Sequence, residues 1–251
     1  MEWKQRIEKQ LAANIKEVKD AAYVQLATVA NGRPANRTVV FRGFIGEDHS
    51  KETEWQSDLL CFDVDIRTPK IKQIEACPFG EICWWMSKTG DQFRLTGQMH
   101  LIANPTHPVH SSKTVPDHLA EDHICARHPE KGLVWDWEQE RVRQWEKCSP
   151  GLRANWVWPS PGQPKASNDP SSIMQFVPKF DLKEPPAHPN GQQYTPEEHQ
   201  ELARLGKDHF VILAFEVERV DHYKPYEQPQ QRVIFEKQEG TGEWKMTEVN
   251  P

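Results

Sequence analysis

An Asn-Gly turn between two β-forming runs is the feature that most limits how this chain can fold. Asn31-Gly32 lies between residues 23–29 and 37–44, two runs rich in β-branched and aromatic residues. Asn and Gly tolerate the positive φ angles that a two-residue hairpin turn requires. The sequence therefore predicts an antiparallel β-hairpin near the N-terminus.

The second strand of this hairpin carries an arginine on each face. Side chains alternate along a strand, so Arg37 and Arg42 point to opposite sides. A guanidinium that is buried without a partner is unfavourable, so each arginine needs an anion or solvent. A phosphorylated ligand would supply the anion, whereas surface carboxylates or exposure to water are the alternatives.

A second cationic cluster follows the apolar strand predicted at residues 59–63. Thr68 is a favourable N-cap and Pro69 suits the first helical position, which predicts a short helix. The free N–H groups and positive dipole end of that helix would lie beside Arg67 and Lys70. This arrangement is typical of an anion site, and an ordinary capped helix with a solvated basic face is the alternative.

The spacing of apolar residues outlines the remaining elements. An amphipathic first helix that packs on the predicted strands is indicated by the helical spacing of Trp3, Ile7, Leu11, Ile15 and Val18. Further helices are predicted at 117–126, 133–145 and 195–206, the last with a capping box. Strands are predicted at 81–86, 92–102, 210–217, 232–235 and 244–249. The Pro-, Ser- and Gly-rich residues 150–190 predict a long loop.

Four features of the chain follow one another in the order found in the pyridoxamine 5′-phosphate oxidase-like family of FMN-binding split-barrel proteins, and the chain resembles that family. The features are the strand with Arg37 and Arg42, the helix cap at residues 67–70, the strand 81–86 with its two tryptophans, and the strand that Gln92 opens. The resemblance runs from about residue 15 to 101 and resumes from about 209 to 251. It implies a mainly β fold with peripheral helices, a split β-barrel of about six antiparallel strands. It also implies one FMN-binding domain, 1–251, with a helical insertion at about 115–148 and a Pro-rich loop at about 150–194.

By that resemblance the cofactor is FMN. Arg37 and Lys70 would hold its phosphate, with Arg67 and Thr68 assisting from the helix cap. Arg42 would lie near the flavin ring, where the family usually places lysine, and would favour negative charge on the ring. The other residues that the resemblance assigns to FMN are Thr38, Val39, Val40, Asp63, Val64, Gln92, Tyr223 and Arg232. Trp158, in the Pro-rich loop, either shields a flavin face or belongs to a plain connection.

The chain departs from the family at the substrate. The family's oxidases carry an Arg-x-His pair just upstream of the position of Arg232, and here residues 226–231 hold neither side chain. The resemblance implies an FMN-dependent oxidoreductase that transfers hydride between a small substrate and FMN. It assigns no catalytic side chain, because flavin N5 exchanges the hydride itself. A flavin-binding or flavin-storage protein with little turnover is the alternative. Family members usually form a homodimer with FMN at the interface, so we expect one here.

Composition narrows the remaining classes of function. The formal net charge of −6 argues against binding to nucleic acid or to an anionic membrane surface. The chain lacks an apolar run of about 20 residues, so we expect no membrane span and no signal peptide. Its five cysteines lack disulfide-scaffold spacing and fit reduced thiols in the cytoplasm.

Histidine and cysteine cluster between residues 118 and 148, but without a metal-binding pattern. His123, Cys125 and His128 match no common zinc spacing, and the sequence has neither Cys-x-x-Cys nor His-Glu-x-x-His. We therefore expect no metal. The glycine-rich dinucleotide, P-loop and nucleophile-elbow motifs are also missing from the sequence, which removes those enzyme classes.

Overall fold

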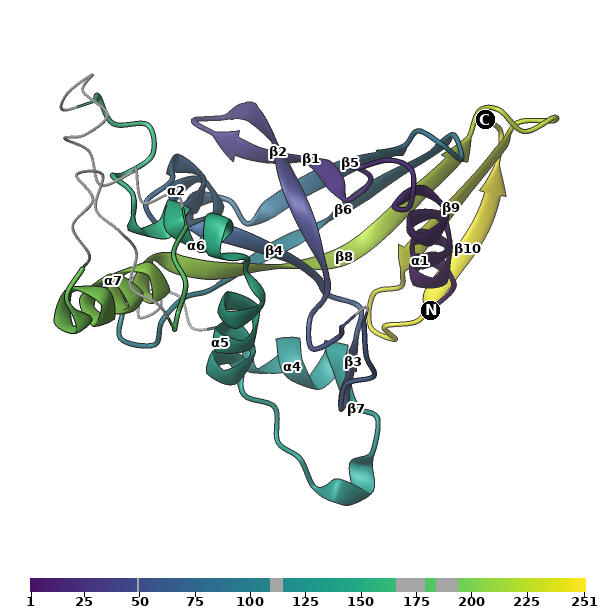
Figure 1. Ribbon diagram of the computed structural model, residues 1–251. Helices are drawn as coiled ribbons and strands as arrows, with labels where there is room; N and C mark the ends of the chain where they lie inside the picture. The colour runs from purple at the N-terminus through teal and green to yellow at the C-terminus, as the bar shows by residue number, and fades with distance from the viewer. Residues whose placement is uncertain (49, 109–114, 166–178, 184–193) are drawn as a thin grey trace.

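The computed structural model describes residues 1–48, 50–108, 115–165, 179–183 and 194–251. Six antiparallel strands form a barrel: β1 (Tyr23–Ala30), β2 (Arg33–Phe44), β4 (Leu60–Asp65), β5 (Phe79–Met86), β6 (Asp91–Ile102) and β8 (Phe210–Lys224). Their order is β8-β4-β2-β1-β5-β6, and β6 closes the barrel by pairing with β8. β9 (Gln231–Lys237) and β10 (Trp244–Val249) extend the sheet beyond β8 (Figure 1). The predicted fold class is confirmed.

β1 and β2 form the predicted hairpin. Asn31 and Gly32 make its turn with φ angles of 52° and 73°. Ala30 pairs with Arg33, so β2 begins at Arg33 rather than at Arg37. The ladder continues up to the turn because the conformation of Asn-Gly matches the twist of the two strands.

Apolar side chains fill the barrel, and α1 (Glu2–Asn14) packs against one side of it (Figure 1). Trp3 and Ile7 are fully buried, and the ring of Trp3 lies 5.5 Å from that of Trp244 on β10. Ile15 follows the end of α1 and is 51% exposed. The first helix therefore ends four residues before Val18, the last residue of its predicted apolar face, because residues 15–17 form a turn.

A second apolar core lies outside the barrel. It is formed by one face of β8, by α5 (Trp137–Lys147), by α6 (Pro150–Val157) and by α7 (Pro196–His209). Phe210, at the start of β8, contacts the rings of Trp145 and Trp156 at 5.5 Å and 5.1 Å. The first half of β8 is thus buried on both faces, which explains its continuous apolar sequence.

Two predicted helices have different bounds in the structure. The prediction for 117–126 is wrong at its end, where α4 (Asp117–His123) gives way to β7 (Ile124–Ala126). β7 pairs with β3 (Trp55–Ser57) in a separate two-stranded sheet, and strands this short leave no alternation to detect. α5 begins at Trp137 rather than at residue 133, because the Asp136 carboxylate accepts the N–H groups of Glu138 and Gln139.

The predicted loop at 150–190 is wrong for its first residues, which form α6. Ser149 Oγ accepts the N–H of Leu152 at 3.3 Å, and Pro150 occupies the first helical position. Proline is tolerated there because the first helical N–H has no partner within the helix. Most of the remaining predicted loop lies outside the described residues.

The other predicted helices are present. α2 (Pro69–Ala76) begins at Pro69, and the capping box of α7 joins Thr195 and Glu198 in both directions. A 3₁₀ turn, η1 (Pro129–Lys131), lies within the insertion. In the part of the chain that the structure describes, none of the helices combines the length and apolarity needed to cross a bilayer.

Candidate functional site

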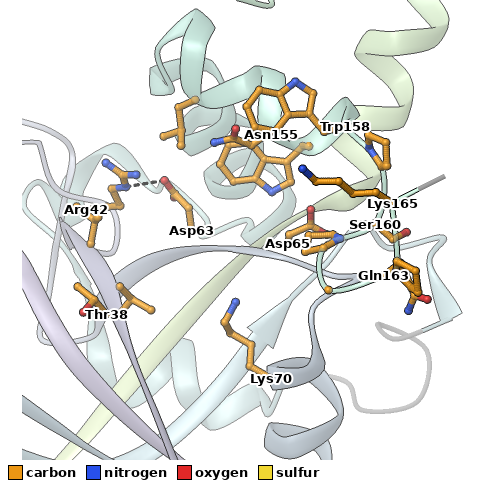
Figure 2. A pocket seen from close by; sticks show the side chains of 18 residues that line it. Thr38, Arg42, Asp63, Asp65, Lys70, Asn155, Trp158, Ser160, Gln163 and Lys165 are labelled. Atoms are coloured by element: carbon orange, nitrogen blue, oxygen red, sulfur yellow. Dashed lines mark ion pairs between the residues drawn. The ribbon is translucent and has the colours of Figure 1, made fainter. Parts of the chain in front are cut away.

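A cavity of about 630 Å³ opens between the barrel and α6 (Figure 2). Strands β2 and β4 form one wall, the start of α2 lies below, and α6 with residues 158–165 forms the opposite wall. The predicted FMN residues that line it are Thr38, Val39, Val40, Arg42, Asp63 and Lys70. Those outside its lining are Arg37, Val64, Arg67, Thr68, Gln92, Tyr223 and Arg232.

Strand alternation explains how β2 contributes to the cavity. Phe41 is buried in the barrel, so the neighbouring side chains Val40 and Arg42 point outward toward α6. The pairing of β2 with β4 shifts register between Phe41 and Phe44, which places Arg42 in an irregular part of the ladder. Its side chain reaches the cavity from there.

Lys70 places positive charge at the α2 end of the cavity, and Arg37, which lies outside the lining, is close enough for its charge to act on Lys70. Figure 2 shows the Lys70 ammonium pointing from α2 toward the cavity, and its Nζ donates to Thr68 Oγ1 at 3.1 Å. Arg37 donates to the neutral oxygens of Leu26, Thr28 and Gln73 at 3.2, 2.6 and 2.8 Å.

Both cations are partly desolvated, and neither forms an ion pair with a carboxylate among the described residues. Burial lowers the pKa of Lys70, the positive charge of Arg37 lowers it further, and the negative charge of Asp65 opposes both effects in part. Burial also lowers the pKa of Arg37. An anion bound beside these side chains would relieve their mutual repulsion. The residues present therefore fit a phosphate group.

Arg67 is directed to protein rather than into the cavity. Its guanidinium pairs with the Asp65 carboxylate at 2.6 Å and donates to the Trp158 carbonyl at 2.5 Å and the Asn155 carbonyl at 3.4 Å. Arg67 therefore binds the C-terminal end of α6. Thr68 Oγ1 donates to the Asp65 carbonyl at 2.7 Å, so it makes no cap hydrogen bond to α2.

Arg42 forms an ion pair with Asp63 on the cavity wall. Arg42 Nε lies 2.6 Å from Asp63 Oδ2 (Figure 2). Burial raises the pKa of Asp63, and the charge of Arg42 opposes the rise. Cys148 Sγ donates to the same carboxylate oxygen at 3.9 Å, and burial raises the pKa of this thiol, which keeps it protonated. The cation expected beside the ring thus has a protein counter-ion.

The sequence prediction missed α6 as a wall of the cavity, although it weighed Trp158 as a cover for one flavin face. Asn155, Trp156 and Trp158 line the cavity from α6 and its C-terminal end. The indole N–H of Trp156 donates to the carbonyl of Val64 at 3.3 Å, which ties α6 to β4. The Ser149-Pro150 pair, a recognisable helix start, is the signal that could have located this wall.

Gln92, Tyr223 and Arg232 form a row elsewhere in the sheet. Gln92 pairs with Tyr223 across β6 and β8, and Tyr223 pairs with Arg232 across β8 and β9. Arg232 makes two hydrogen bonds to Asp221, at 2.9 and 2.7 Å, and Tyr223 donates to Gln230 at 2.9 Å.

This row lies far from the cavity within the chain. Asp63 of the cavity pairs with Ile212 near the start of β8, whereas Tyr223 lies near the end of that strand. At about 3.3 Å per residue, the path along β8 between Ile212 and Tyr223 is roughly 35 Å. Figure 1 shows α2 and α6 at one end of the molecule and β9 toward the other. One protomer therefore does not bring the two groups together.

Two comparisons of the sequence find proteins that are similar to this chain. A family model described as pyridoxamine 5′-phosphate oxidase, FMN-binding domain, matches residues 1–103. The Arabidopsis thaliana protein named pyridoxine/pyridoxamine 5′-phosphate oxidase 2 is 31% identical over 253 residues, which cover 99% of this chain and 96% of that protein.

Solved structures show the same architecture. A pyridoxamine 5′-phosphate oxidase-related, FMN-binding protein from Nostoc punctiforme matches with a TM-score of 0.67 and 27% identity, over 100% of this chain and 98% of that one. PhzG from Burkholderia lata, solved with tetrahydrophenazine-1-carboxylic acid, matches with a TM-score of 0.57 and 16% identity, over 98% and 91% of the two chains. At that identity the second match supports the fold alone.

Proposed function

Because the chain belongs to the pyridoxamine 5′-phosphate oxidase-like family, whose cofactor is FMN, we propose that FMN binds in the cavity between β2, β4 and α6. Its phosphate lies at Arg37 and Lys70. The observation that carries this placement is the charge at the α2 end of the cavity, where two partly desolvated cations donate hydrogen bonds to neutral oxygens and the carboxylate that acts on Lys70, Asp65, is already paired with Arg67. A phosphate dianion supplies the missing negative charge.

The other cavity residues position the ring. Thr38, Val39 and Val40 line the cavity from β2 and lie along the ring, and the ion pair of Arg42 and Asp63 contacts the edge of the ring. Arg67 and Thr68 assist through protein contacts, because Arg67 holds the end of α6 and Thr68 accepts a hydrogen bond from Lys70. The side chain of Val64 is buried, and its carbonyl anchors Trp156. Trp158 covers one side of the cavity.

The site is completed by a second copy of the chain. A homodimer with FMN at its interface brings the row of Gln92, Tyr223 and Arg232 from one copy to the cavity of the other. The roughly 35 Å along β8 between the cavity and this row supports the proposal, since one FMN does not contact both groups within a single protomer.

The reaction is hydride transfer between a small substrate and FMN. FMN, when bound, supplies the hydride-accepting atom. The chain binds the phosphate and orients the ring between β2 and α6. The side chains of Trp156 and Trp158 form a wall that limits the access of water to the ring. The full-length similarity to an Arabidopsis protein named as an oxidase of pyridoxine and pyridoxamine 5′-phosphates supports an oxidoreductase of this group.

A flavin-binding protein with little turnover is a second candidate. Gln228 and Gln230 occupy the stretch where the resemblance expects arginine and histidine, and Gln230 is already bound by the Tyr223 hydroxyl. A neutral amide does not balance the charge of a phosphorylated substrate. Reduction of bound flavin by pyridoxamine or pyridoxine 5′-phosphate under anaerobic conditions distinguishes the oxidase from this candidate.

We place the protein in the cytoplasm as one domain. The location is supported by Cys61, Cys77, Cys83, Cys125 and Cys148, which are all free thiols, and the single domain by strand β8, which contributes residues to both apolar cores.

The binding proposal is tested by titrating FMN into the apoprotein while following flavin fluorescence. Lys70→Ala should weaken FMN binding by about 1.5–3 kcal/mol, the range for hydrogen bonds to charged groups. Lys72→Ala is the matched control, because Lys72 lies on the same helix, is exposed and does not line the cavity. Equal affinity of the two variants, or a wild-type protein that binds no FMN, would overturn the proposal.

A further inference from the structure

The ion pair between Arg42 and Asp63 joins neighbouring barrel strands at the cavity surface. The two side chains come from β2 and β4, next to the paired residues Phe41 and Phe62. The Asp63 side chain is 6% exposed and that of Arg42 is 30% exposed, so the carboxylate is the more deeply placed partner. Both residues line the cavity, which means that their charges act on whatever occupies it.

Among the described residues, Arg42 is the cation that pairs with the Asp63 carboxylate. The Cys148 thiol, 3.9 Å from the carboxylate, is an uncharged donor. Burial raises the pKa of Asp63, while the charge of Arg42, 2.6 Å away, and the charge of Lys147 lower it. The guanidinium therefore stabilises the ionised carboxylate, and the carboxylate in turn offsets the charge of the guanidinium at the cavity wall.

We infer that Asp63 is a positioning residue that sets the reduction potential of the bound flavin by restraining Arg42 and offsetting its charge. The inference rests on the proposed placement of FMN in this cavity. A reduced flavin carries more negative charge than an oxidised one, so an unopposed Arg42 favours the reduced state. With Asp63 ionised beside it, Arg42 still orients the ring edge but stabilises reduction less.

A purely structural ion pair is the competing explanation. β2 and β4 share few regular backbone pairs around the register shift, and the ion pair spans that region. In that case, loss of the pair lowers the melting temperature and leaves the relative affinity for the two flavin states unchanged. The reduction potential of bound FMN therefore separates the two roles, whereas stability does not.

The experiment is a redox titration of FMN-loaded protein with a reference dye, together with a titration of oxidised FMN. Asp63→Asn removes the negative charge and keeps the shape of the side chain. It should favour reduced over oxidised FMN by at least tenfold relative to wild type, which equals a rise of about 30 mV for a two-electron couple. Asp63→Glu retains the charge and should stay within threefold of wild type.

Cys148→Ala is a second control, because it removes a neighbour of Asp63 without changing charge. It should also stay within threefold. If Asp63→Asn does not fold, Asp63→Ser removes the same charge with a smaller side chain, and the same criteria apply. A folded neutral variant with an unchanged potential would overturn the inference.

The two proposals fail in distinguishable ways. If Lys70→Ala weakens FMN binding and the potential of Asp63→Asn is unchanged, only the role of Asp63 is wrong. If wild-type protein binds no FMN, or if Lys70→Ala binds it normally, the placement of the cofactor is wrong and the inference falls with it.

Discussion

His123 joins the helical insertion to the barrel through two carboxylates. It lies at the end of α4, with Nδ1 2.7 Å from Asp58 Oδ1 and Nε2 3.1 Å from Glu216 Oε1 on β8. Burial alone would lower the pKa of His123, but the hydrogen bonds of Asp58 and Glu216 outweigh it and raise the pKa to about 9. The charged imidazolium is thus part of the folded structure at neutral pH.

This pKa predicts a dependence of stability on pH. The pKa of about 9 in the folded state lies above the ordinary value of 6.5, so the stabilisation is complete below pH 6.5 and is lost as the pH rises through 9. The free energy of unfolding should fall by up to roughly 3 kcal/mol across that window. Urea denaturation of wild type and His123→Gln measures it, since the variant should lack this part of the decline. Parallel profiles for the two proteins would contradict the assignment.

Sequence motifs pointed to several residues that line the cavity, but they did not reveal which groups those residues contact. Lys70, Arg42 and Asp63, which the resemblance assigns to FMN, all line it. Arg67 lies at the helix cap, where a residue that binds phosphate would lie, but its guanidinium forms an ion pair with the nearby carboxylate of Asp65. Spacing along the chain does not distinguish a ligand anion from a protein anion. Asn155 escaped prediction because it reaches the cavity only through the tertiary placement of α6.

The packing of α1 on the barrel gives a direct comparison between a buried and an exposed apolar residue. Trp3 is fully buried against Phe44 and Trp244, whereas Ile15 lies beyond the end of the helix and is 51% exposed. Trp3→Ala should lower the free energy of unfolding by about 3–5 kcal/mol because it leaves a large cavity.

Chemical denaturation of both variants checks this comparison. Ile15→Ala should lie within about 0.5 kcal/mol of wild type, as surface substitutions usually do. Similar losses at the two positions would mean that α1 continues past Asn14 and buries the whole predicted apolar face.

Regular elements were predictable where a local signal fixed them. The Asn31-Gly32 turn, the Pro69 helix start and the capping box at Thr195 all depend on neighbouring residues, and all are present. β3 and β7 were not predicted, since two strands of three residues form only by pairing with each other across the fold. α6 was obscured because the prolines around it outweighed its own cap.

The arrangement of the whole chain separates two groups of FMN residues, and this predicts a dimer with composite sites. Lys70 and Arg232 are assigned to the same cofactor, but Lys70 lies on α2 just after Asp65, which pairs with the first residue of β8, whereas Arg232 pairs with Tyr223 near the end of that strand. Lys70→Ala and Arg232→Ala should each weaken FMN binding as homodimers. A heterodimer of the two variants contains one site with both residues intact.

Co-expression with two affinity tags isolates that heterodimer. It should bind one FMN per dimer with wild-type affinity, while light scattering should give twice the mass of one chain. A heterodimer that binds no better than its parents, or wild-type protein that is monomeric when loaded with FMN, would contradict the composite site.

The central claim is that Arg37 and Lys70 recognise the phosphate of FMN, and comparison with riboflavin tests it most directly because riboflavin lacks only that group. Wild-type apoprotein should bind FMN at least a hundredfold more tightly than riboflavin, a difference of about 2.7 kcal/mol. In Arg37→Ala/Lys70→Ala this preference should shrink to less than tenfold, with riboflavin affinity nearly unchanged. An equal preference for FMN in both proteins would show that the phosphate binds elsewhere.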